Sequence, residues 1–351
     1  MEIKKTDRSR RDQIDFDNPG FGEIFSDHML TADYKGGTWG PPQIVPYGTM
    51  DIYPAICSLH YGQIVFEGLK AFYTRNGKIN IFRLQKYHER MTRSNQRLCI
   101  PEISLDLFRE GLIELVKLDK EWVPRKRGNS LYIRPFVFAT DNFLGVKVSE
   151  TYRFIIITSP VGAYYKEGIN PVKLTTPGEY VRAARGGLGA AKTPANYAAT
   201  LLPGEVAKKR GFTQVLWLDG IEGKYVEEVG TMNIFFYIGD ELITPPLEGT
   251  ILPGVTRDSV VQLSKEWGIK VNERKVSIDE VFKASKEGRL KEIFGSGTAA
   301  VISPVGEIHH GDGRIIINQG KIGSLSQKLY DEITGIQYGE NADRYGWCYW
   351  L

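Results

Sequence analysis

The sequence holds few of the side chains that build disulfide frameworks or metal centres. Its three cysteines, Cys57, Cys99 and Cys348, are an odd number and form no CxxC pair. The five histidines form no HExxH motif, and we expect the adjacent pair His309-His310 to lie in a turn. Neither a disulfide framework nor a zinc or thiolate metal site is therefore predicted, and unpaired cysteines are typical of the reducing cytosol.

Long apolar runs and an excess of charge are missing too. No stretch approaches the ~20 apolar residues of a membrane span, and the N-terminus MEIKKTDRSRRDQ has no apolar signal core behind its charges. The 45 basic and 42 acidic residues give a formal charge of +3, and we expect the basic cluster from Lys4 to Arg11 to be a solvated arm. These features argue against a membrane protein or a nucleic-acid surface and predict a cytoplasmic location.

What is there is an ordinary globular composition, with 42% apolar and 25% charged residues. A chain of 351 residues suits two domains, because single cores stop growing near ~250–300 residues. Glycine, proline and charged residues interrupt the apolar runs that follow Pro160, as in a connecting segment. We predict a first domain over residues 1–165, a connection over 166–180 and a second domain over 181–351.

Apolar periodicity predicts a mixed α/β first half and a β-rich second half. Strands are predicted at 78–83, 130–138, 153–160 and 214–220, and as a pair within 233–246 that joins at Gly239-Asp240. Helices are predicted at 84–98, 105–118 and 256–267.

Lys192 is the candidate for covalent chemistry. It follows Gly186, Gly187 and Gly189 in RGGLGAAKTPANY, where small residues let backbone and ligand approach closely around one long amine. Such an amine can form a Schiff base, although most lysines are solvated surface charges. The same run lies one residue away from the nucleotide-binding pattern GxxxxGK[ST]. That alternative is the weaker one, because a charged segment precedes the run and Pro194 follows it.

Three further segments are candidates for holding a phosphate group. They are the helix entry PGVT (253–256), the glycine turn GSGT (295–298), and Arg90 on the predicted helix 84–98. Unpaired N–H groups and an arginine fork bind phosphate well, although each segment alone is more often a chain reversal or a surface ion pair. Glu228 enters an apolar run and needs either water or a cationic partner, for which a protonated cofactor ring nitrogen would serve.

In this order, the segments closely resemble the branched-chain aminotransferases, pyridoxal-phosphate enzymes of fold type IV. The resemblance covers nearly the whole chain and consists of eight motifs: LHYGQIVFEGLKAF (59–72), FRLQKYHERMTRSNQRLCIP (82–101), LYIRPFVF (131–138), SPVGAYYKEG (159–168), AAKTPANYAA (190–199), EEVGTMNIFF (227–236), ILPGVTRDS (251–259) and FGSGTAA (294–300). It implies a two-domain α/β (α+β) fold, with a smaller N-terminal α/β domain, a larger β-rich C-terminal domain with helices, and the cofactor at their interface.

The resemblance also implies roles for single residues. Lys192 would form an aldimine with pyridoxal 5'-phosphate and act as the base that moves the substrate proton. Tyr197 would bind the phenolic oxygen of the cofactor, and Glu228 would pair with its ring nitrogen. The remaining cofactor contacts would come from Thr231 and, at the phosphate, from Arg90, Val255, Thr256 and Thr298.

The implied reaction is reversible transamination between L-leucine, L-isoleucine or L-valine and 2-oxoglutarate. Arg134 would receive the distal carboxylate of glutamate. The walls of the substrate pocket would be Tyr61, Phe66, Tyr132, Tyr164 and Ala299. Val146 would reach the pocket of a partner subunit, so a homodimer is expected, with amino acids and 2-oxo acids as the other partners and neither nucleic acid nor membrane. Related reactions, those of D-amino-acid aminotransferases and aminodeoxychorismate lyases, stay open.

Three features depart from the family pattern. Pro194 and Ala195 stand where two small residues, often glycines, are usual, which could alter the local backbone. The pair Pro-Gly at 203–204 interrupts the helix expected after the lysine motif. Ala300 and Ser303 replace the CxxC pair of the mammalian enzymes, so thiol regulation is not expected there.

Overall fold

The computed structural model describes residues 1–162 and 169–351, and the chain divides into two compact units. The first unit consists of Met1–Tyr164, Ala191–Pro194 and Gly335–Leu351, and the second of Tyr165–Ala190 and Ala195–Thr334. The sequence-based division assigns the lysine segment and the C-terminus to the second domain. Here both are compact with the first unit, which is therefore not the smaller of the two.

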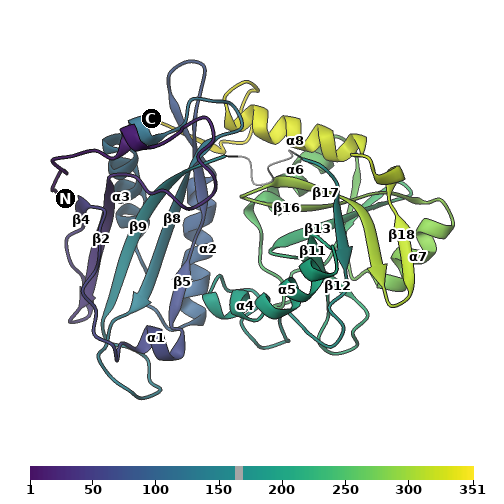
Figure 1. The fold of residues 1–351 in the computed structure, drawn as a ribbon, viewed down its shortest axis with the longest axis horizontal. Coiled ribbons are helices and arrows are strands. Elements are labelled where there is room, and N and C mark those ends of the chain that lie inside the picture. Colours follow the sequence, from purple (N-terminus) through teal and green to yellow (C-terminus); the bar gives the residue numbers. More distant parts are fainter. Residues whose placement is uncertain (163–168) are drawn as a thin grey trace. The chain divides into compact units, whose positions relative to one another are not determined.

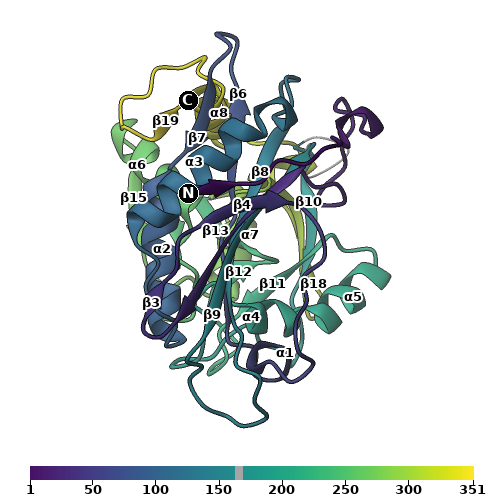
Figure 2. The ribbon, with the colours of Figure 1, turned by 90° about the vertical axis from the view of Figure 1, so that its left-hand side faces the viewer.

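One mixed sheet forms the centre of the first unit. Its ten strands among the described residues are β1 (Glu2–Ile3), β2 (His28–Lys35), β3 (Thr38–Trp39), β4 (Gln43–Pro46), β5 (Ile64–Phe66), β6 (Leu69–Tyr73), β7 (Ile79–Phe82), β8 (Ser130–Ala139), β9 (Tyr152–Val161) and β19 (Cys348–Trp350). They follow the order β1-β4-β2-β9-β8-β6-β7-β19, with β3 beside β2 and β5 beside β8. Strand β19 pairs antiparallel with β7 (Figure 2), which attaches the C-terminus to this unit.

Helices cover this sheet. They are α1 (Cys57–Tyr61), α2 (Leu84–Arg97) and α3 (Leu105–Leu118), with short 3-10 turns η1 (Arg11–Gln13) and η2 (Lys120–Trp122). Helix α3 packs on β2 and α2 on α3 (Figure 1). The Ser104 side chain caps α3 by accepting a hydrogen bond from the N–H of Leu107 at 3.1 Å. The predicted helices at 84–98 and 105–118 and the predicted strands of the first half are confirmed.

The backbone of the basic N-terminal arm is docked, whereas its side chains are mostly exposed, as expected of a solvated arm. Strand β1 pairs with β4, and the N–H of Arg10 donates to Asp27 at 3.0 Å. His28 Nε2 accepts a hydrogen bond from the N–H of Thr6 at 3.0 Å. Buried polar groups of the sheet therefore hold the backbone of this arm, a contact that charge clustering in the sequence does not reveal.

The second unit contains a partly closed sheet. Its nine strands among the described residues are β10 (Val172–Thr175), β11 (Gln214–Leu218), β12 (Val226–Val229), β13 (Met232–Ile238), β14 (Glu241–Thr244), β15 (Lys270–Glu273), β16 (Leu290–Gly297), β17 (Val301–His310) and β18 (Gly313–Ile316). They follow the order β12-β11-β10-β17-β16-β13-β14-β15, with β18 beside β17. Because β12 also pairs with β13, the strands from β12 to β13 in this order close into a ring.

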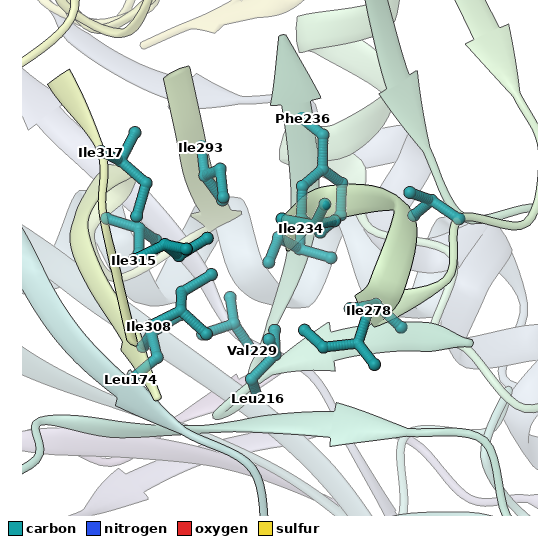
Figure 3. Close-up of a cluster of buried hydrophobic side chains, with 14 of the residues drawn as sticks. Leu174, Leu216, Val229, Ile234, Phe236, Ile278, Ile293, Ile308, Ile315 and Ile317 are labelled. Carbon is teal, nitrogen blue, oxygen red and sulfur yellow. The ribbon is translucent and has the colours of Figure 1, made fainter. Parts of the chain in front are cut away.

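Branched aliphatic side chains fill the core of this sheet, as Figure 3 shows. Leu174, Leu216, Phe236 and Ile308 are fully buried, which stabilises the unit by roughly 1.5–3 kcal/mol per side chain. Helix α7 (Ile278–Lys286) adds Ile278 to the cluster, and its start is fixed because Ser277 accepts a hydrogen bond from the Glu280 N–H at 3.1 Å. The branched side chains that favour strand formation are thus also the ones buried in this core.

The other helices of the second half are α4 (Pro194–Ala198), α5 (Leu201–Lys209), α6 (Val255–Glu266) and α8 (Ser324–Gln337), with the 3-10 turn η3 (Asn318–Gly320). The structure corrects the sequence analysis at two places in this half. Pro203 lies inside α5 without interrupting it, because the N–H groups of a first helical turn have no partner within the helix. The pair His309-His310 ends β17 and does not lie in a turn, since its ladder continues to β18.

Candidate active site

Lys192 is anchored within the first unit on both sides of its backbone. Its N–H donates to Ser94 Oγ at 2.9 Å, and its carbonyl accepts the Phe66 N–H at 3.1 Å. Its Nζ lies 4.9 Å from the centre of the Phe66 ring. Strand β5 and helix α2 therefore fix the position of this amine, and the aromatic face adds a cation–π contact.

Arg90 forms a buried ion pair with Glu67. Its Nε and one terminal nitrogen each lie 2.8 Å from a different carboxylate oxygen, so the pair is bidentate. Arg90 is 4% and Glu67 0% exposed, and Glu67 also accepts the Gly68 N–H at 3.1 Å. The surface ion pair considered as the plain alternative for Arg90 is excluded, and the position of this guanidinium is fixed.

Two cationic side chains contact the Phe66 ring, because Arg134 contacts the same ring as Lys192. The guanidinium carbon of Arg134 is 4.8 Å from the Phe66 ring centre, and its terminal nitrogen donates to the Tyr132 hydroxyl at 3.1 Å. A Cβ at Gly68 would lie 1.9 Å from that hydroxyl oxygen, so a side chain at position 68 would displace Tyr132. Arg134 Nε is buried and has no hydrogen-bond partner among the described residues, as expected of a donor that awaits a ligand.

The other expected pocket residues of the first half are exposed or lie outside the described residues. Tyr61 ends α1 and is 44% exposed beside His60. Val146 is 88% exposed. Tyr164 lies outside the described residues.

Glu228 is buried in the second unit with a cationic partner. Its Oε2 lies 3.1 Å from Arg182 Nε, and its Oε1 accepts the Leu252 N–H at 2.8 Å. The amide of Asn233 approaches the same oxygen at 3.5 Å. Arg182 is anchored in turn, because it donates to the carbonyls of Gly189 and Thr250. Since Glu228 is only 3% exposed, the plain alternative of a solvated carboxylate is excluded.

Several predicted cofactor residues gather at one end of the second sheet. Strand β13 begins beside the ends of β12 and β16, with Val229 opposite Met232 and Asn233 opposite Ser296. The turn after β12, which holds Thr231, and the turn after β16, which holds Thr298 and Ala299, therefore lie at the same end. Asn233 also donates to the Leu252 carbonyl at 2.9 Å, which brings the entry of α6 to this end.

The entry of α6 suits an anion. Gly254 is the N-cap without a side-chain capping bond, and the helical ladder begins when the Asp258 N–H donates to the Gly254 carbonyl. The N–H groups of Val255 and Thr256 thus have no partner within the helix. A Cβ at Gly254 would lie 1.9 Å from Asn233 Oδ1, so this position requires glycine.

The adjoining glycine turn has two further signs of a ligand site. Ser296 Oγ is buried and has no hydrogen-bond partner among the described residues. Val301 closes the turn with φ of 63°, a left-handed conformation that is strained for a β-branched side chain. An unsatisfied hydroxyl, an uncapped helix entry and a held carboxylate together fit a phosphorylated cofactor with a basic ring nitrogen.

Tyr197 lies on the short helix α4. Pro194 is the first residue of that helix, where its fixed φ and missing N–H suit the helix start. The departure from the family pattern therefore begins a helix and does not disrupt it. The Tyr197 carbonyl accepts the Thr200 N–H at 3.0 Å, which holds the helix end.

Comparisons with known proteins agree with this geometry. The family model described as amino-transferase class IV matches residues 64–308. The chain belongs to the class IV aminotransferases. It is 55% identical to branched-chain-amino-acid aminotransferase 2 of Bacillus subtilis, over 93% of this chain and 90% of that one.

Solved structures show the same fold. The branched-chain amino acid aminotransferase of Escherichia coli is 28% identical with a TM-score of 0.77, covering 92% of this chain and 98% of that one. The branched-chain amino acid aminotransferase of T.th. with pyridoxamine 5'-phosphate is 26% identical with a TM-score of 0.74, covering 91% and 97%. The expected fold, type IV with mixed helices and sheets, is confirmed.

The alternative chemistry is not supported in this class IV aminotransferase. A nucleotide-binding loop follows directly on a buried strand, whereas β10 ends at Thr175, well before Gly186. Among residues 1–162 and 169–351, no group of acidic, histidine and cysteine side chains could hold a metal ion. In the same residues, no helix has the length and apolar character needed to cross a bilayer.

Four residues that the sequence analysis did not single out hold the predicted ones. Glu67 and Ser94 hold Arg90 and Lys192 in the first unit, and Arg182 and Asn233 act around Glu228 in the second. Glu67 carried a usable signal, since it is a carboxylate within the apolar run IVFEGL. Arg182 carried none, because its segment has no periodicity.

Proposed function

We propose that this enzyme transfers amino groups reversibly between L-leucine, L-isoleucine or L-valine and 2-oxoglutarate, with pyridoxal 5'-phosphate as cofactor. The observation that carries the proposal is Lys192, an amine held at both sides of its backbone within a chain 55% identical to a branched-chain aminotransferase. The products would be branched-chain 2-oxo acids and L-glutamate.

The proposed cofactor contacts follow from the charge and hydrogen-bonding capacity of each group. Glu228 would keep a proton on the ring nitrogen, because it is a buried carboxylate fixed by Arg182 and Leu252. Tyr197 would donate to the phenolic oxygen. The phosphate would be held by Arg90, Thr298 and the N–H groups of Val255 and Thr256, with Thr231 nearby.

The catalytic work falls to Lys192. When bound, the cofactor supplies an electron-accepting ring and a carbon that exchanges amino groups. Lys192 Nζ would take the proton from the Cα of the first substrate and deliver one to the Cα of the second. The backbone hydrogen bonds to Ser94 and Phe66 would orient this amine toward one face of the substrate.

The substrate site must accept both an apolar and an acidic side chain. Phe66, Tyr132 and Ala299, together with Tyr61 and Tyr164, would supply apolar walls. Arg134 would receive the distal carboxylate of glutamate, using the donor that has no partner among the described residues. Because Arg134 lies against the Phe66 ring, the apolar wall and the carboxylate-binding group would lie at one surface.

We also propose that the enzyme acts as a cytosolic homodimer. Phe143, Leu144 and Val146 are 48%, 65% and 88% exposed in one loop, apolar area that a partner subunit would cover. Val146 would thereby reach the partner's substrate pocket. The three cysteines are unpaired, as is usual in the cytosol.

The test is glutamate formation from L-leucine and 2-oxoglutarate by the purified protein with added cofactor. We expect Lys192→Ala to lower kcat by at least ~10³-fold, because base catalysis and covalent attachment are both lost. Lys208→Ala, at an exposed lysine of α5, is the matched control and should change nothing. Activity with D-alanine or aminodeoxychorismate in place of L-leucine would contradict the proposal.

A further inference from the structure

A cavity in the second unit lies beside Glu227, the residue that precedes Glu228 in β12. Its volume is about 100 Å³, it opens to solvent, and its lining includes Glu227, Tyr225 and Lys275. Leu218 pairs with Val226 and Trp217 with Glu228, so Glu227 is the extra residue of a β-bulge in β12. Glu227 lines this cavity, while Glu228 serves the proposed cofactor site.

Glu227 is a buried carboxylate with one unsatisfied oxygen. It is 7% exposed, and its Oε2 has no hydrogen-bond partner among the described residues. Burial raises the pKa of Glu227, and a side-chain hydrogen bond with Thr250 opposes this only in part. An unsatisfied buried carboxylate oxygen is costly, so the site favours a ligand that brings a hydrogen-bond donor or a positive charge.

The neighbouring carboxylate, Asp219, does not share this need. Its two oxygens accept the N–H groups of Ile221, Glu222, Lys224 and Tyr225 at 2.7–3.1 Å. The carboxylate of Asp219 therefore stabilises the turn that follows it in the chain. Since no metal-binding cluster occurs among the described residues, the cation that suits Glu227 is an ammonium group.

The rest of the lining holds two cations, two exposed carboxylates (Glu222 and Glu248) and apolar surface. Lys275 is exposed, 5.2 Å from the Tyr225 ring and only loosely paired with Glu248 at 3.9 Å. Arg185, also exposed, is a second cation at the cavity. Two prolines at 245–246 and Ile251 form an apolar wall.

We propose that this cavity is a second binding site for a free α-amino acid with an apolar side chain. The ammonium group binds Glu227, the carboxylate binds Lys275 and Arg185, and the side chain packs on the apolar wall. The ligand also contacts Thr250, whose carbonyl holds Arg182 beside Glu228. The site therefore borders the segment that fixes Glu228, and its existence does not depend on the proposed reaction.

The test is equilibrium dialysis of the holoenzyme with radiolabelled 1-aminocyclopentane-1-carboxylate. This amino acid has no Cα hydrogen, so it cannot be transaminated, and any binding at Lys192 is seen as a change in cofactor absorbance. We expect one further molecule bound per chain without such a change. Glu227→Gln should weaken this binding at least tenfold, and Lys275→Glu, at an exposed position, should weaken it severalfold.

Glu222→Gln is the matched control, since Glu222 is an exposed carboxylate at the same cavity and should leave the affinity unchanged. Lys192→Ala should also retain the second site, which separates this proposal from the proposed function. The proposal is overturned if all bound probe perturbs the cofactor, or if Glu227→Gln binds like the parent protein. Unchanged binding in Lys275→Glu would overturn the assignment of the carboxylate.

Discussion

Each unit buries one arginine–carboxylate pair next to its predicted site residues, and the two pairs use their charges in opposite ways. In the first unit Arg90 is the proposed phosphate ligand, and Glu67 is the companion that holds it. In the second unit Glu228 is the proposed cofactor ligand, and Arg182 is the companion. In both units the charged group proposed to bind the cofactor thus has a buried counter-ion, which offsets part of the free energy of its desolvation.

The two pairs differ in the groups that donate hydrogen bonds to the carboxylate. Both oxygens of Glu67 are taken by the Arg90 fork, with one added N–H from Gly68. Glu228 instead shares its oxygens between Arg182 and the backbone N–H of Leu252. Loss of the companion should therefore damage the first unit more than the second.

The largest effect is expected when the first pair is broken. Glu67→Gln leaves Arg90 as a buried charge without its counter-ion, which should cost about 3–5 kcal/mol of unfolding free energy. Urea unfolding measures this. The control is Glu89→Gln, which removes an exposed pair with Lys86 and should cost less than about 0.5 kcal/mol. Equal losses in the two variants would show that burial does not matter here.

The second pair should respond more in catalysis than in folding. Arg182→Met should cost about 2–3 kcal/mol, because Glu228 keeps the Leu252 N–H, and should lower kcat about 10²-fold as Glu228 loses its fixed position. Unfolding and steady-state rates test both parts. Arg210→Met removes an exposed arginine and serves as the control. A kcat equal to that of the parent would contradict the positioning role of Arg182.

A third comparison uses two helix glycines of the second unit. Gly254→Ala places a Cβ 1.9 Å from Asn233 Oδ1 and should cost about 1–3 kcal/mol, with weaker cofactor binding. Gly204→Ala, inside α5, meets nothing within 4 Å and should stabilise the protein by about 0.5–1 kcal/mol. Thermal unfolding should show opposite signs, and two shifts of the same sign would contradict the packing at the α6 entry.

The smallest effect concerns another buried cation of the first unit. Burial lowers the pKa of Lys70 to about 8. Between that pH and ~10.4 the unfolded chain binds more protons than the folded one, so stability rises with pH. The gain from pH 8 to pH 9 should be about 1 kcal/mol and should vanish in Lys70→Met. Lys78→Met, at an exposed lysine, should keep the parent slope in urea unfolding.

Sequence patterns predicted the elements that carry the site better than the contacts within it. Apolar spacing predicts α2, α6 and β13, and the segments PGVT and GSGT, predicted to bind phosphate, lie at the entry of α6 and at the end of β16. Pro194 departs from the family pattern, yet proline is well suited to the first position of α4. The same principle explains why Pro203 does not interrupt α5.

Local pattern determined the strands, the helices, the turns proposed to bind phosphate and the amine proposed to react, because periodicity, capping and backbone freedom depend on residues a few positions apart. Tertiary structure decided which charges are buried and what neutralises them. Arg182 meets Glu228, and Ser94 meets Lys192, across long stretches of chain. Such pairs depend on burial and on which strands become neighbours. Neither can be predicted from residues that are close in the sequence.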